Sequence, residues 1–190
     1  MNNKKIATLA IFSALIIILQ ILSTYINIGA FPITLTLIPI IIAGAILGIK
    51  EASFLGFMFG LIVFIVVISG GDPNSLIMLT SNPVATITII FTKGICCGLF
   101  SSYVYAKLEN KNKKLAIILS SIVAPVTNTG IFLIGLILFF DSNITVFIST
   151  FLSFNFLIEL ITNVLIAPSL LTLIDRYKNS YNWLNYVNIF

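Results

Sequence analysis

Residues 83–106 read PVATITIIFTKGICCGLFSSYVYA. A helix needs ~20 predominantly apolar residues to cross a bilayer, and this stretch meets that requirement although Lys93 stands near its middle. Lys93 is the only charged residue between Asp72 and Lys107. A charged side chain in the hydrocarbon layer is costly, and it is usually retained for a function or paired with a partner. The stretch therefore predicts a membrane helix that carries a functional or paired cation.

The rest of the chain is equally apolar. Of its 190 residues, 59% are hydrophobic and 8% are charged, whereas soluble domains carry about 25% charged residues. The basic residues do not form a stripe on a polar face, so the net charge of +4 does not indicate nucleic-acid binding. We predict an all-α, multi-pass integral protein of the cell membrane, surrounded by the lipid bilayer.

Six apolar segments approach the length of a membrane span. They are residues 6–28, 31–49, 52–69, 83–106, 115–139 and 147–174. A polar loop and a weakly apolar stretch that ends at Asn82 separate the third segment from the fourth. We expect residues 1–176 to form a single six-helix transmembrane domain and residues 177–190 to form a short cytoplasmic or interfacial tail.

The basic residues other than Lys93 predict the orientation. With six spans, all of them fall on one side of the membrane: Lys4, Lys5, Lys50, Lys107, Lys111, Lys113, Lys114, Arg176 and Lys178. The opposite loops contain Asp72 and Asp141 but no Lys or Arg. The positive-inside rule then places both termini in the cytoplasm.

Small residues recur at four-residue spacing, which lets membrane helices approach closely. We expect most of these stripes to pack inside the monomer: Gly44 and Gly48, Ala52, Gly56 and Gly60, and Gly94 and Gly98. Ala10 and Ala14 lie near the cytoplasmic end of the first span, where a second subunit could dock. We interpret Cys96 and Cys97 as small apolar residues.

Three strongly polar residues on three predicted spans reach a similar depth. At ~1.5 Å per residue, Lys93, Asn128 and Glu159 lie roughly 15–18 Å from the outer ends of their helices. Other polar residues share helix faces with them: Asn82 and Thr86 with Lys93, and Asn155 and Asn163 with Glu159. Two interpretations remain open. One is an outward-facing pocket in which Lys93 meets an anionic group; the other is a Lys93–Glu159 ion pair that clamps two helices, with asparagines as interhelical hydrogen bonds.

The absence of several sequence motifs reduces the number of function classes that fit this chain. The sequence contains no histidine and no cysteine–carboxylate cluster, so we expect neither a metal site nor a cofactor. It contains no GxxxxGK[ST] or G-x-S-x-G element. We therefore do not expect an enzyme, and active transport would require a separate ATPase.

With its length, six spans and the segment Ala10-Ile11-Phe12-Ser13-Ala14, the chain resembles the substrate-binding S components of energy-coupling factor (ECF) vitamin transporters. The resemblance covers nearly the whole chain. It implies a non-catalytic subunit that binds a small water-soluble vitamin from outside. It also implies that Ala10 and Ala14 meet a transmembrane coupling (T) subunit, which is driven by two ATPase subunits.

Three stretches resemble the pantothenate branch of this family: residues 34–39, 81–83 and 126–130. Pantothenate is small and carries a carboxylate, which suits Lys93, and its hydroxyl and amide groups suit Asn128, Asn155 and Asn163. Riboflavin, folate or a thiamine precursor is the alternative substrate. Two other classes remain open: a stand-alone secondary transporter with Glu159 as its proton site, and a membrane enzyme or structural subunit.

Overall fold

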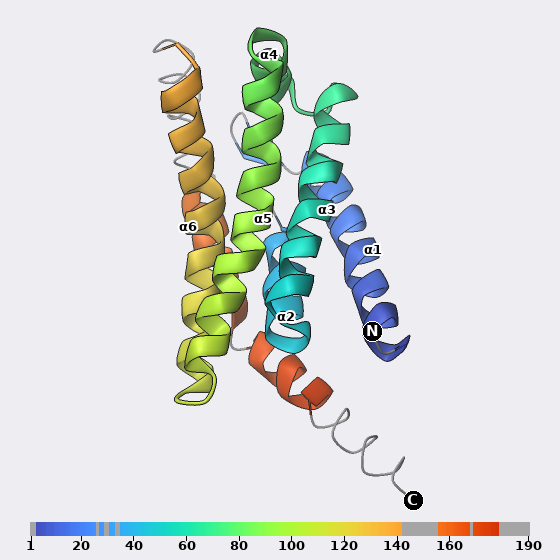
Figure 1. Cartoon of the computed structure of the whole chain (residues 1–190), viewed down its shortest axis with the longest axis vertical. Helices are drawn as coiled ribbons and strands as arrows, with labels where there is room; N and C mark the ends of the chain where they lie inside the picture. Colours follow the sequence, from blue (N-terminus) through green and yellow to red (C-terminus); the bar gives the residue numbers. More distant parts are fainter. Residues whose placement is uncertain are drawn as a thin grey trace, which may run out of the picture.

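The computed structural model describes residues 3–25, 27–28, 31–32, 35–141, 156–167 and 169–178 (Figure 1). Its labelled elements are α1 (Asn3–Tyr25), β1 (Asn27–Ile28), β2 (Phe31–Pro32), α2 (Leu37–Leu47), α3 (Ile49–Ile68), α4 (Pro73–Ser81), α5 (Pro83–Leu108) and α6 (Lys113–Phe139). Two more helices, Phe156–Ala167 and Ser169–Lys178, meet at a bend of 49°. Apart from the two-residue antiparallel pairing of β1 with β2, the described fold is helical, as predicted.

The long helices have the length and composition of membrane spans. Four of them, α1, α3, α5 and α6, are long and apolar enough to cross a bilayer, and the bent pair at the C-terminal side would be a fifth. The predicted bounds of the third, fourth and fifth spans agree with α3, α5 and α6 to within three residues. The chain is therefore a multi-pass membrane protein.

The predicted second span, residues 31–49, is wrong in length. Its helix, α2, has 11 residues and at ~1.5 Å per residue reaches about 16 Å, roughly half of the ~30 Å hydrocarbon layer. It begins at Leu37, which places Pro39 in the first turn, where a helix tolerates proline without losing a hydrogen bond. It ends at Gly48, whose φ of +108° favours glycine. Most of α2 is buried within the bundle.

The weakly apolar stretch before Asn82 is a helix, which the hydropathy pattern did not predict. Asp72 caps α4: its carboxylate accepts hydrogen bonds from the backbone N–H of Ser75 at 3.2 Å and from the Ser75 hydroxyl at 2.5 Å. Pro73 occupies the first helical position. An acidic cap followed by proline is a local start signal that hydropathy does not detect.

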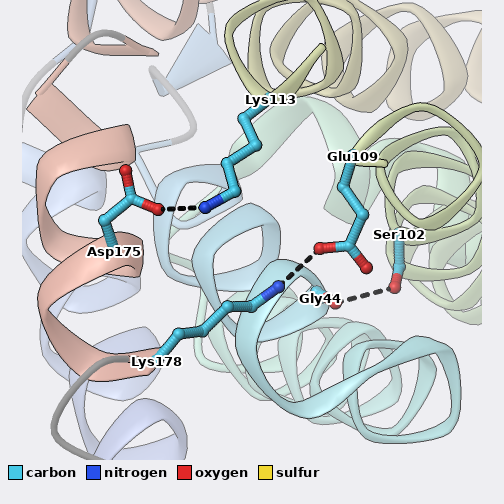
Figure 2. Close-up of polar contacts among 6 residues, drawn as sticks. All are labelled: Gly44, Ser102, Glu109, Lys113, Asp175 and Lys178. Atoms are coloured by element: carbon cyan, nitrogen blue, oxygen red, sulfur yellow. Dashed lines mark hydrogen bonds and ion pairs between the residues drawn. The ribbon is translucent and has the colours of Figure 1, made fainter. Parts of the chain in front are cut away.

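Helix α5 lies between α3 and α6 (Figure 1). Its contact with α3 is made of small residues: a Cβ added at Gly94 would collide with the carbonyl oxygen of Gly56, and one added at Gly98 with that of Ala52. The predicted packing of these stripes within the monomer is thus confirmed. Toward α2, the Ser102 hydroxyl donates a hydrogen bond of 3.1 Å to the carbonyl oxygen of Gly44 (Figure 2).

Helix α6 is held to α5 by a buried hydroxyl. Ser120 Oγ donates to the carbonyl oxygen of Ser101 at 2.9 Å, and this contact sets the antiparallel register of the two helices. Cys97 is a fully buried member of the hydrophobic core cluster, in keeping with its interpretation as an apolar residue.

Most of the charged residues lie at one end of the bundle. The start of α1, the α2–α3 and α5–α6 connections and helix 169–178 all lie at the lower end in Figure 1, opposite α4. Three ion pairs connect these segments: Lys5–Glu51 at 2.6 Å, Lys113–Asp175 at 2.9 Å and Lys178–Glu109 at 2.5 Å (the last two in Figure 2). The predicted clustering of cations on one side therefore holds in space.

The predicted sixth span, residues 147–174, coincides only partly with described residues. The C-terminal part of this predicted span corresponds to helices 156–167 and 169–178. The start of this span and residues 179–190 of the predicted tail lie outside the described residues.

Candidate functional site

Lys93 lies between two aromatic rings from neighbouring helices. Its Nζ is 4.9 Å from the ring centroid of Phe132 on α6 and 6.0 Å from that of Phe59 on α3. Both rings are buried, whereas Lys93 itself is half-buried. Distances within about 6 Å are those at which an ammonium is attracted to an aromatic face.

Close helix packing places the Phe59 ring there. A Cβ added at Gly94, the residue after Lys93, would lie 3.3 Å from Cδ1 of Phe59 as well as colliding with the Gly56 backbone. The absence of a side chain at Gly94 therefore leaves room for the ring of α3 beside the ammonium of α5.

Asn128 lies one turn before Phe132 on the same face of α6. This residue is 5% exposed, and its Oδ1 has no hydrogen-bond partner among the residues that the structure describes. Pro125 sits inside α6, where it cannot donate a backbone hydrogen bond to the carbonyl of Ser121. A buried acceptor without a partner is unusual in folded proteins, so Asn128 is available to a ligand that carries a donor.

Glu159 and Asn163 are adjacent on one face of helix 156–167. Their side chains are 4% and 2% exposed. Asn163 donates from Nδ2 to the backbone carbonyl of Glu159 at 2.8 Å, while its Oδ1 has no partner within the described part of the chain. Helix 156–167 thus carries a second buried amide oxygen that can accept a hydrogen bond.

Lys93 and Glu159 do not form an ion pair with each other within 4.0 Å. The direct clamp between these two side chains is therefore not formed in this structure, and the contacts of the Lys93 ammonium are aromatic.

Asn82 and Thr86 mainly serve the start of α5. Asn82 is the N-cap, and its Oδ1 accepts from the backbone N–H of Ala85 at 3.2 Å. The Thr86 hydroxyl donates to the carbonyl oxygen of Asn82 at 2.9 Å. Asn82 is eleven residues from Lys93, roughly 16 Å along the helix, so it does not join the Lys93 group. Asn155 lies outside the described residues.

Sequence reasoning missed the two rings. The chain contains sixteen phenylalanines, and no motif distinguishes Phe59 and Phe132 from the others. Only the register of α3, α5 and α6 reveals that these two flank Lys93.

The first helix presents a second feature. Ala10 and Ala14 are exposed on α1, beside Ile11, which is 67% exposed. This places the predicted docking residues on an apolar face of the described bundle. Among the described residues, no group of three or more His, Cys, Asp or Glu side chains gathers as a metal site.

Long apolar helices around a half-buried cation and buried amide oxygens define an integral membrane protein with a polar interior. A comparison with family sequence models matches residues 4–171 to the ECF transporter, substrate-specific component. The chain belongs to this family of transport proteins.

One curated relative is the pantothenic acid transporter PanT of Lactococcus lactis subsp. cremoris (strain MG1363). The two sequences are 28% identical over 190 aligned residues, which cover 92% of this chain and 95% of the relative. No solved structure matches the chain.

Proposed function

We propose that this protein is the vitamin-binding subunit of an ATP-driven ECF-type importer and that it takes up pantothenate from outside the cell. Membership of the family supports the role, and the similarity to PanT supports the substrate. The observation that carries the proposal is the half-buried Lys93 ammonium in a bundle that also buries two unpartnered amide oxygens.

The chemistry of the site matches that of pantothenate. Its carboxylate is a partner for the Lys93 ammonium, because a charge-assisted hydrogen bond is stronger than a neutral one. Its hydroxyl and amide N–H groups are donors, and Asn128 Oδ1 and Asn163 Oδ1 are acceptors that have no partner. A ligand that fills these acceptors would remove the penalty of leaving them buried and unpaired.

Binding of pantothenate to the purified protein by calorimetry tests the substrate. Pantothenol is the matched probe, because it replaces the carboxylate with an alcohol. We expect Lys93→Leu to weaken pantothenate binding about tenfold to a hundredfold, in line with ~1.5–3 kcal/mol for a hydrogen bond to a charged group. Pantothenol binding should change little. Tight binding of riboflavin, folate or a thiamine precursor without any binding of pantothenate would contradict the substrate assignment alone.

Partners and orientation form the second part of the proposal. Both termini face the cytoplasm, and the exposed Ala10 and Ala14 of α1 contact a T subunit that is coupled to two ATPase subunits. Reconstitution of the four subunits in vesicles tests this part: uptake should require ATP. Uptake by the protein alone, driven by a proton gradient, would instead support a secondary transporter that uses the buried Glu159.

A further inference from the structure

The Lys93 ammonium needs stabilisation before any ligand arrives. Its aliphatic stem can pack against apolar neighbours, but its charged head lies within a membrane helix, where an unsolvated cation is costly. Lys93 makes no ion pair within 4.0 Å among the described residues. The groups in contact with its ammonium are the rings of Phe132 and Phe59.

These rings offer a specific attraction. The face of an aromatic ring carries a partial negative charge, and its interaction with an ammonium strengthens when both are shielded from water. The two rings come from α6 and α3, on either side of α5. The ammonium has three N–H donors, and an aromatic ring accepts none of them as a full hydrogen bond. The ammonium therefore keeps donors for an anion while the two rings lie beside it.

We infer that Phe59 and Phe132 are positioning residues that hold the Lys93 ammonium in place for the anionic group of the ligand. The part of this inference that concerns the ligand rests on the proposed function; the attraction between the rings and the ammonium does not. If a ring is removed, the ammonium loses one of its two aromatic contacts and is no longer prepositioned for an anion.

A double-mutant cycle on the ligand-free protein tests the attraction itself. Phe132→Leu removes the ring and keeps an apolar side chain, and Lys93→Leu removes the cation. We expect Phe132→Leu to lower the apparent Tm by about 2–4 °C more in the wild-type background than in the Lys93→Leu background, the shift that ~1 kcal/mol of coupling produces in a chain of this size. Phe132→Tyr retains the ring and should restore most of the difference.

Phe91→Leu is the matched control. Phe91 also lies on α5 and packs against the Phe57 ring at 5.2 Å between centroids, but no cation lies over either ring among the described residues. Its effect on Tm should be equal in both backgrounds. Equal effects of Phe132→Leu in the two backgrounds would show ordinary packing and overturn the inference.

Ligand binding provides the second readout. Phe132→Leu should weaken pantothenate binding about three- to tenfold, as expected for a cation–π contact in a partly desolvated site, and should add nothing in the Lys93→Leu background. An undiminished effect in that background would mean that the ring contacts the ligand directly and would overturn the positioning role. If the wild type binds no pantothenate, the proposed substrate fails, while the Tm cycle still decides the inference.

Discussion

At the scale of single residues, four buried polar side chains differ in whether their hydrogen-bonding capacity is used. Ser102 and Ser120 give their hydroxyl protons to backbone carbonyls of neighbouring helices. Asn128 and Asn163 each retain an amide oxygen without a partner. The two serine hydrogen bonds stabilise the bundle. The two asparagine oxygens are acceptors that a ligand could fill, and leaving them buried without a donor lowers the stability of the ligand-free protein.

This contrast predicts opposite effects of two substitutions. Asn128→Leu removes an unpaired buried acceptor, so we expect an unchanged or raised Tm without ligand and pantothenate binding weakened about five- to tenfold. Ser102→Ala removes a bonded hydroxyl and should lower Tm while leaving affinity nearly unchanged. Thermal unfolding and calorimetry on both variants provide the measurement. A fall in Tm for Asn128→Leu as large as that for Ser102→Ala would assign Asn128 a structural role.

Lys93 can be selected as a candidate site residue from the sequence alone, because it is a single charged residue within an apolar segment. The same holds for Asn128 and Glu159, whose depth follows from the helical rise. The rings beside Lys93 are different, because an apolar residue in an apolar chain carries no local signal. Their role depends on which faces of three helices meet, and this is decided by tertiary packing.

At the scale of secondary-structure elements, the α3–α5 contact depends on the absence of side chains. The backbones of the two helices meet at Gly56 and Gly94, and again at Ala52 and Gly98. Membrane helices associate largely through such close packing. The stripes are visible in the sequence, and their packing inside the monomer is as predicted, whereas the pairing of the α3 stripe with the α5 stripe is known only from the structure.

Gly94→Ala tests this contact. The added methyl group would collide with the backbone of Gly56, so the helices must separate, and overpacking of this kind typically costs about 1–3 kcal/mol. We expect a lower Tm and weaker pantothenate binding, since Phe59 would move away from Lys93. Gly130→Ala on α6 is the control, because a Cβ there has nothing within 4 Å. An equally stable Gly94→Ala protein would show that the contact is looser than described.

The elements that sequence reasoning misjudged are α2 and α4. Hydropathy alone merges an extended entry with a short helix, so residues 31–49 were predicted as one span. It also overlooks a weakly apolar helix of nine residues such as α4. In both cases the boundaries are set by local chemistry: the position of Pro39 in α2, and the Asp72 cap with Pro73 in α4.

At the scale of the whole molecule, charge divides the bundle into two ends. Three ion pairs and the remaining cations of the chain ends and connections lie at one end. Exposed ion pairs contribute about 0–1 kcal/mol each, so this arrangement adds little to the stability of the bundle. The sequence predicted the grouping because the positive-inside rule acts on connections and not on tertiary packing.

Cysteine labelling of intact cells tests the orientation. In a Cys96→Ala, Cys97→Ala background, we expect Asp141→Cys, after the end of α6, to react with a membrane-impermeant maleimide. Lys111→Cys, in the α5–α6 connection, should react only after the cells are opened. The reverse pattern would place the cationic end outside and contradict the proposed topology.

The glycine contact between α3 and α5 has a mechanical consequence. At Gly56–Gly94 and Ala52–Gly98 the two backbones touch with no side chain between them that could change rotamer as the helices slide, so we expect α3 and α5 to move as one rigid unit. Any opening that admits or releases a ligand would then have to occur at the other helix–helix interfaces of the bundle. The distance between probes attached to α3 and α5 should therefore stay constant through the transport cycle. This helix pair would then serve as a fixed reference against which the movement of every other helix can be measured.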